Sequence, residues 1–97
     1  MREVVHGDVV AAACALMAVP PAGWEARIAG YLIQADAADR YRRRIGRAHP
    51  VWGNGSLMGA VLSGGDVRPE PRLSDPVYAE AMVAVLMALI RRKQAVQ

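Results

Sequence analysis

Apolar and polar positions alternate along the chain with helical spacing, and they predict four helices and no strand. The first predicted helix spans 9–18, a stretch without a charged residue, and Asp8 is its expected N-cap. Pro20 and Pro21 follow this stretch and are expected to end the helix, because proline cannot continue one.

The second predicted helix is the longest, spanning 22–45, and Gly46 supplies its C-terminal stop. One face is an apolar stripe made of Trp24, Ile28, Tyr31, Ala35 and Ala38. The opposite face is charged and carries Glu25, Asp36, Asp39, Arg40, Arg43 and Arg47. We therefore expect a long central helix with one side in the core and one side in solvent.

The second half of the chain predicts a short helix, a connector and a long C-terminal helix. Ser56 opens the short helix SLMGAVL, which a Ser-Gly-Gly sequence ends. Residues 64–74 form an extended connector, and Asp75 caps the last helix with Pro76 in its first position. The chain is thus predicted to be one all-α domain, 1–97, composed of helices and a loop in 8–63, the connector in 64–74 and the apolar helix in 75–93.

Two of these helices are apolar on nearly every face. Residues 9–19 contain no charge, and between Ala79 and Ile90 only Glu80 is polar. Such a helix needs partners on every side, and a four-helix chain of 97 residues can hardly surround two of them. We therefore expect a homo-oligomer in which a second copy covers one of the two helices. The candidate contact residues are Met82, Val85, Leu86 and Leu89.

Composition and segment length exclude several classes of protein. The single cysteine, Cys14, cannot form an intramolecular disulfide and is expected to be a buried, reduced thiol. The N-terminus MREVVHGD does not begin a signal peptide. The longest apolar run, from Ala81 to Ile90, has ten residues, about half the length that a bilayer-spanning helix needs. We expect a soluble, cytoplasmic protein without a membrane partner.

Residues suited to catalysis or metal binding are few. His6 and His49 are the only histidines, and His6 with Asp8 would form a local polar cap. Together with Cys14 they are too few for a metal site. No set of nucleophile, base and orienting residue is visible, and the WGNGS segment lacks the lysine of a phosphate-binding loop. We expect no enzymatic activity and no cofactor.

Eight of the twelve basic residues lie in two clusters, 40–47 and 91–93, and the net charge is +3. Asp36–Arg40 and Asp39–Arg43 have the spacing of stabilising helix-surface pairs, while Arg42 is expected to pack its stem along the apolar stripe. Arg44 and Arg47 are then left most free. Two interpretations stay open: a solvated helix end with cations at its negative pole, or a phosphate-binding patch that reads no sequence.

The loop HPVWGNGS, residues 49–56, follows the basic cluster directly. Trp52 is either a stacking platform for a base or a partner side chain, or a plug that fixes the loop to the core. Gly53 and Gly55 are expected to have positive φ, and Asn54 to bond its own backbone. The candidate residues for binding DNA or a partner are Arg40, Arg42, Arg43, Arg44, Arg47, Trp52 and Asn54.

Sequence-specific DNA recognition is not expected. The segment SLMGAVL offers no Arg, Asn or Gln to a base edge, and about ten residues separate it from the preceding helix, too many for a helix-turn-helix.

The segments HGDVVAAACALMAVP and ADRYRRRIGRAHPVWGNGSLM resemble the small terminase subunits of alphaproteobacterial gene transfer agents, over residues 4–60. These agents are phage-like particles that package random host DNA. The resemblance implies a helical, ring-forming protein that binds double-stranded DNA non-specifically and recruits the large terminase, which holds the ATPase and nuclease. The sequence departs from the phage pattern because no helix-turn-helix domain precedes the oligomerising helices, which puts specific DNA recognition in doubt.

Two further classes of function remain open. One is a helical adaptor that binds a protein partner, and not DNA, through Trp52 and the basic helix end. The other is a small regulatory DNA-binding protein, which the missing recognition helix disfavours.

Overall fold

The computed structural model describes residues 1–65 and 67–95, and this part of the chain is all-helical, as predicted. Its elements are α1 (His6–Leu16), a short 3-10 turn η1 (Pro21–Gly23), α2 (Trp24–Ile45), α3 (Leu57–Ser63) and α4 (Pro76–Ala95). Asp66, which belongs to the predicted connector, lies outside the described residues.

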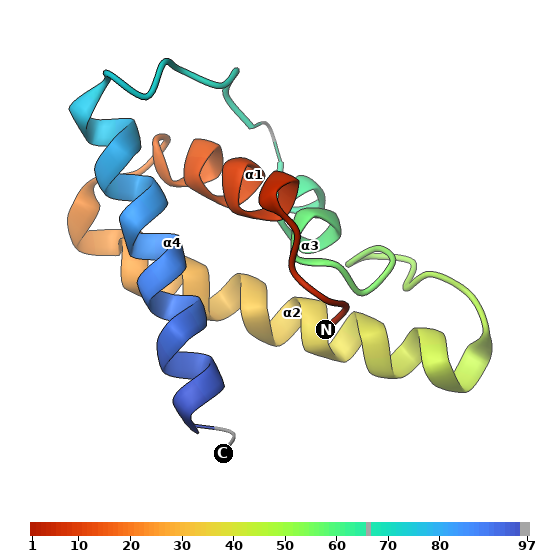
Figure 1. The fold of residues 1–97 in the computed structure, drawn as a ribbon. Coiled ribbons are helices and arrows are strands. Elements are labelled where there is room, and N and C mark those ends of the chain that lie inside the picture. The colour runs from red at the N-terminus through yellow and green to blue at the C-terminus, as the bar shows by residue number, and fades with distance from the viewer. Residues whose placement is uncertain (66, 96–97) are drawn as a thin grey trace.

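Helix α1 lies at the centre of the molecule, with α3 and α4 packed on either side of it and α2 crossing beneath them (Figure 1). The hydrophobic core joins residues of all four helices, including Leu16, Leu57, Val61 and Tyr78. The five residues of the predicted apolar stripe of α2 are all buried, which confirms the orientation of this helix: Trp24, Ile28, Tyr31, Ala35 and Ala38. Cys14 is also buried with a free thiol. Its pKa is raised, chiefly by burial and to a smaller extent by the charge of Glu70.

Three predicted helix ends are confirmed. Gly46 ends α2 in the left-handed conformation with φ of 80°. Ser56 is the N-cap of α3, and its hydroxyl accepts the Gly59 N–H at 3.0 Å. Asp75 precedes α4 and caps it, because its carboxylate accepts the N–H groups of Val77 at 2.9 Å and Tyr78 at 3.3 Å.

The predicted start of α1 is wrong. The N-cap is Val5, and Asp8 is the third residue of the helix. The buried Asp8 carboxylate reaches back to accept the Val5 N–H at 2.9 Å, so the helix gains a turn before it. Its other oxygen accepts the N–H of Met58 at 2.9 Å. Asp8 therefore joins α1 to α3, and His6 lies within the helix rather than before it.

The two apolar helices differ in how completely the chain covers them. Six of the buried core residues lie on α1, whereas α4 buries only Tyr78, Ala81 and Val85. Val85, expected at a contact between subunits, is fully buried in the chain's own core. Met82 and Leu89 are partly buried against the same core. The apolar residues that α4 exposes are Val77, Val83, Leu86, Met87 and Ile90.

The connector before α4 is held through the buried Tyr78, whose hydroxyl donates to the Glu70 carboxylate at 3.2 Å. Burial, together with the charge of that carboxylate and its hydrogen bond, raises the pKa of Tyr78 to about 12. No helix within residues 1–65 and 67–95 combines the length and the apolar character needed to cross a membrane.

Candidate functional site

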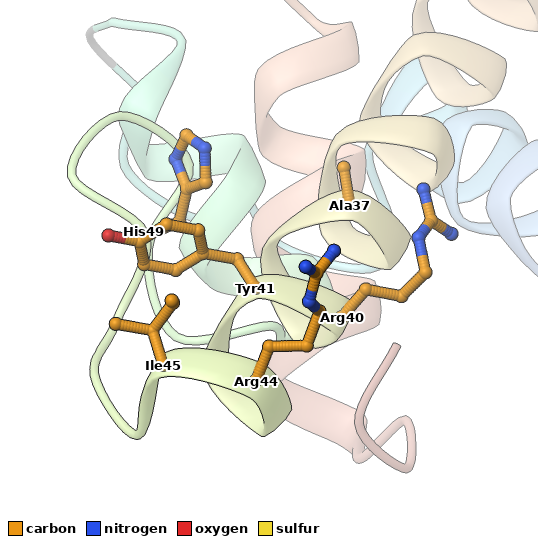
Figure 2. A pocket seen from close by; sticks show the side chains of 6 residues that line it. All are labelled: Ala37, Arg40, Tyr41, Arg44, Ile45 and His49. Atoms are coloured by element: carbon orange, nitrogen blue, oxygen red, sulfur yellow. The ribbon is translucent and has the colours of Figure 1, made fainter.

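An open groove lies at the C-terminal end of α2, with a volume of about 430 Å³ (Figure 2). We call it the α2 groove, and its lining residues are Ala37, Arg40, Tyr41, Arg44, Ile45 and His49. Residues four apart stand above one another on a helix, so 37, 41 and 45 form one row and 40 and 44 form the next. His49 is the single lining residue that comes from the loop.

Gly46 explains how His49 reaches the helix. A left-handed residue after the last turn reverses the chain direction, and at Gly46 this conformation has no steric cost. The loop then closes on itself, because His49 N–H donates to Gly53 O at 2.8 Å and Gly53 N–H donates to His49 O at 3.1 Å. The reversal sets the His49 and Tyr41 rings edge to face, with ring centroids 4.9 Å apart and ring planes at 69° (Figure 2).

The His49 ring is fixed on several sides. Its Nδ1 accepts the backbone N–H groups of Val51 and Trp52, both at 3.0 Å, so the proton of the neutral ring is on Nε2. The indole of Trp52 stacks on the imidazole, with centroids 4.9 Å apart and planes at 10°. Tyr41, His49 and Trp52 therefore form a continuous row of three rings.

Trp52 is half-buried and does not belong to the hydrophobic core, which the structure forms around Trp24 instead. Its aromatic contact is with His49, one of the residues that line the groove. The structure therefore places Trp52 as a support for the ring that lines the groove.

The remainder of the loop is anchored close to α2. Gly53 and Gly55 have φ of 83° and 91°, as predicted. Gly55 is buried so tightly that a Cβ there would lie 2.8 Å from Asp39 Cα, and its carbonyl accepts the Arg2 N–H at 2.8 Å. The Asn54 side-chain oxygen accepts from the backbone N–H of Ser56 at 3.1 Å and from its hydroxyl at 2.7 Å. Asn54 thus stabilises the loop locally, as expected.

The acidic residues of α2 have different partners from those predicted. Asp39 pairs with Arg43 at 3.1 Å as expected, but it is buried and also accepts from Arg42 at 2.8 Å. Asp36 does not pair with Arg40. Its carboxylate accepts two bonds from Arg92 of α4, at 2.6 and 2.7 Å.

The amino group of Met1 lies between these two carboxylates, 2.9 Å from Asp36 and 3.3 Å from Asp39. The N-terminal segment lies beside the middle of α2 (Figure 1), and α4 crosses the same helix. Both acidic residues therefore face neighbouring segments rather than solvent, which the periodicity of a single helix cannot reveal.

Both carboxyl groups have a lowered pKa. For Asp39, the hydrogen bond from Arg42 lowers the pKa and outweighs burial, with further lowering by the Met1 amino group and Arg43. For Asp36, partial burial acts to raise the pKa, but the hydrogen bonds and charges of Arg92 and the Met1 amino group prevail. Both residues are therefore held in the charged form at neutral pH.

These contacts divide the arginine cluster into two groups. Arg42 and Arg43 are engaged by Asp39. Arg40, Arg44 and Arg47 are exposed, and none has a carboxylate partner within residues 1–65 and 67–95. Arg40 and Arg44 border the α2 groove, and Arg47 lies just beyond the helix end. Arg40 was expected to be paired and belongs instead with the two free arginines.

Sequence reasoning missed the aromatic side of this site. Tyr41 was not singled out, and His49 was considered only for catalysis or metal binding. A signal for it was present in the sequence. Ala37, Tyr41 and Ile45 follow one another at intervals of four residues, and two arginines four residues apart lie beside them on the helix. In the described part of the chain, no cluster of three His, Cys, Asp or Glu residues has the arrangement of a metal site. The chemistry that the groove offers is an aromatic and apolar wall beside unpaired cations.

Residues 2–89 match the model of a family described as Domain of unknown function (DUF7742), and the chain belongs to this family. No curated protein and no solved structure matches the chain. The family description names no activity, so function has to be argued from the groove and its surroundings.

Proposed function

We propose that this DUF7742 protein is a small terminase-like DNA-packaging protein. In this proposal it self-associates, binds double-stranded DNA without sequence preference and recruits a large terminase subunit that loads DNA into phage-like gene transfer agent particles. The resemblance over residues 4–60 supports the packaging role. The observation that carries DNA binding is a group of three exposed arginines at and just after the α2 groove that have no carboxylate partner among the described residues: Arg40, Arg44 and Arg47.

The arginines have the arrangement of a phosphate-binding surface. Arg40 and Arg44 are one helical turn apart, about 6 Å along the axis, and Arg47 follows the helix end directly after Gly46. Exposed guanidinium groups without acidic partners are available to phosphates, which provide affinity but no sequence information. The position of α3 also supports binding without sequence preference. Its residues Leu57, Ala60 and Val61 are buried in the molecule. This helix is committed to packing and is not offered to a DNA groove.

Self-association is supported by the exposed face of α4. Val83, Leu86, Met87 and Ile90 have spacings of three, four and seven residues from the first, so they form one apolar stripe along the helix. A second copy of the chain would remove this stripe from water. Each of these four exposed residues lies one position after a predicted contact residue, and Leu86 belongs to both sets.

DNA binding can be tested by fluorescence anisotropy with random-sequence duplexes over a salt series. Replacing Arg40, Arg44 and Arg47 with Ala should weaken binding equally on all sequences and reduce the slope of log K against log salt by about 2 to 3. The matched control replaces three exposed arginines elsewhere, Arg27, Arg68 and Arg72, with Ala. An equal loss in both triple variants would contradict a localised site, because net charge alone would then explain the binding.

Self-association can be tested by light scattering coupled to size exclusion. Leu86→Glu should dissociate the assembly into folded monomers, whereas Val85→Glu should unfold the chain because Val85 is fully buried. A wild-type protein that elutes with the mass of a single chain at micromolar concentration would contradict self-association.

The second candidate is a helical adaptor that binds a protein partner and not DNA. The apolar and aromatic wall of the α2 groove favours it, because Tyr41 and Ile45 could equally receive a partner's side chain. Two results together would support this candidate. The wild-type protein would not bind DNA at low salt, and it would bind the large terminase in a pull-down whereas the arginine triple variant would not.

A further inference from the structure

The α2 groove has two unlike sides. Tyr41, Ile45 and Ala37 present an aromatic and apolar wall from one row of the helix, while Arg40 and Arg44 supply cations from the adjacent row (Figure 2). The volume of about 430 Å³ lies in the range of small-molecule sites. A planar aromatic group attached to an anion would use both sides at once.

A double helix uses only one of these sides. Its phosphates can reach the arginines, but its bases are paired and stacked, so their faces are unavailable to the wall. An unpaired base exposes a face that stacks on an aromatic side chain whatever its sequence, and its own phosphate stays close to it.

The wall is already formed in the unbound protein. Trp52 stacks on His49, two backbone N–H groups hold the His49 Nδ1, and the Tyr41 and His49 rings meet edge to face. A ligand therefore does not have to order the loop when it binds, which removes an entropic cost.

We propose that the α2 groove binds one unpaired base of single-stranded DNA, with the base against Tyr41 and Ile45 and its phosphate between Arg40 and Arg44. The protein then binds single strands more tightly than duplexes. Arg47 is exposed and lies in the chain between Ile45 and His49, which both line the groove, so it offers a further cation to the phosphates of a continuing strand and favours a strand over a free nucleotide. This inference rests on the proposed DNA binding and specifies the form of DNA that the same surface prefers.

The test compares a random 20-nucleotide single strand, its duplex and a deoxymononucleotide, each titrated with the full chain at one fixed salt concentration. Aromatic stacking of one base predicts that the single strand binds about tenfold more tightly than the duplex. Tyr41→Leu keeps an apolar side chain but removes the ring, and it should cancel most of this preference. Ile45→Ala should reduce it by a smaller factor.

The matched control for Ile45→Ala is Ile33→Ala, which truncates another exposed isoleucine of α2 outside the groove and should leave the preference unchanged. Circular dichroism checks that each variant is folded. Should Tyr41→Leu fail to fold, Ala37→Leu fills the groove from the same row of the helix and should likewise abolish the preference.

The outcomes separate this inference from the proposed function. Equal affinity for single strand and duplex, or an equal loss of both in Tyr41→Leu, would overturn the unpaired-base site and leave duplex binding in place. A deoxymononucleotide that binds as tightly as the strand would also overturn it, in favour of a free nucleotide. Binding of neither form of DNA would overturn both proposals.

Discussion

The two ends of α2 each have a tryptophan beside them, and the two residues have opposite surroundings. Trp24 at the N-terminal end is 6 % exposed, packs in the core and donates its indole N–H to the carbonyls of Leu16 at 2.8 Å and Val19 at 3.1 Å. Trp52, in the loop after the C-terminal end, is half-buried and stacks on His49 outside the core.

This difference shows how one helix serves two purposes. Its N-terminal part places Trp24, Ile28, Tyr31 and Leu32 in the core and so contributes apolar burial to stability. None of residues 40–45 at its C-terminal end is buried, and the negative end of the helix dipole stabilises cations there. Three unpaired arginines can be kept together there at little cost to the fold.

The largest effect on stability is expected from Trp24→Ala. Removing this side chain opens a cavity and leaves two carbonyl groups without their donor, so it should cost about 3–5 kcal/mol. For a domain of this size the melting temperature should fall by more than about 12 °C. Thermal and urea denaturation followed by circular dichroism measure both. A loss no greater than that of Trp52→Ala would contradict the division between the two ends.

Gly55→Ala is expected to have the second largest effect. Its φ of 91° is strained for alanine, and the added Cβ would meet Asp39 Cα at 2.8 Å, so we expect a loss of about 2–4 kcal/mol. Gly46→Ala is the control, because Gly46 has a similar φ of 80° but open space around it. Urea midpoints of the two variants isolate the cost of the contact between loop and helix; equal losses would show that the contact adds nothing.

A smaller effect is expected from acidification. The pKa values of Asp36 and Asp39 are lowered from an ordinary value of 3.8, so their contribution to stability is present above about pH 4 and is lost as pH falls through the lowered values. Urea midpoints between pH 7 and pH 2 measure this loss. Asp36→Asn should be less stable than wild type at pH 7, and the difference should shrink at low pH. A constant difference across this range would contradict the role of the charge.

The smallest effect on stability is expected from Trp52→Ala. Its stacking on His49 should contribute about 0.5–1.5 kcal/mol, since the residue lies outside the core. The affinity for single-stranded DNA should nevertheless fall, because His49, which lines the groove, loses the ring that stacks on it. A thermal midpoint lowered by tens of degrees would instead assign Trp52 to the stability of the fold.

The sequence was sufficient for the features that depend on neighbouring residues. The stripe of α2, the left-handed stop at Gly46 and the caps at Ser56 and Asp75 all follow from local spacing or backbone preference, and the structure confirms them. The position of the HPVWGNGS loop next to the basic cluster is local in the same sense, because the loop follows the helix directly.

The features that depend on distant segments could not be predicted in this way. Asp36 binds Arg92, fifty-six positions away, and Asp8 binds the N–H of Met58, fifty positions away. The burial of Val85 likewise depends on which face of α4 meets α1, and an apolar pattern on nearly every face leaves that choice open. The contact of His49 with Tyr41 depends on the direction that the chain takes after Gly46, whereas the sequence predicted only the end of the helix there.

The residues of the α2 groove lie close together in the sequence, and this has a consequence for the order of folding. All six residues lie between positions 37 and 49, so closing the groove requires only a short segment. The Asp36–Arg92 pair closes a far longer loop and has to wait for α4. Because short closures have a smaller entropic cost and form faster, we expect the groove to assemble while the C-terminal helix is still emerging from the ribosome. A nascent chain would then present its basic and aromatic surface before it has the α4 stripe through which copies are proposed to associate.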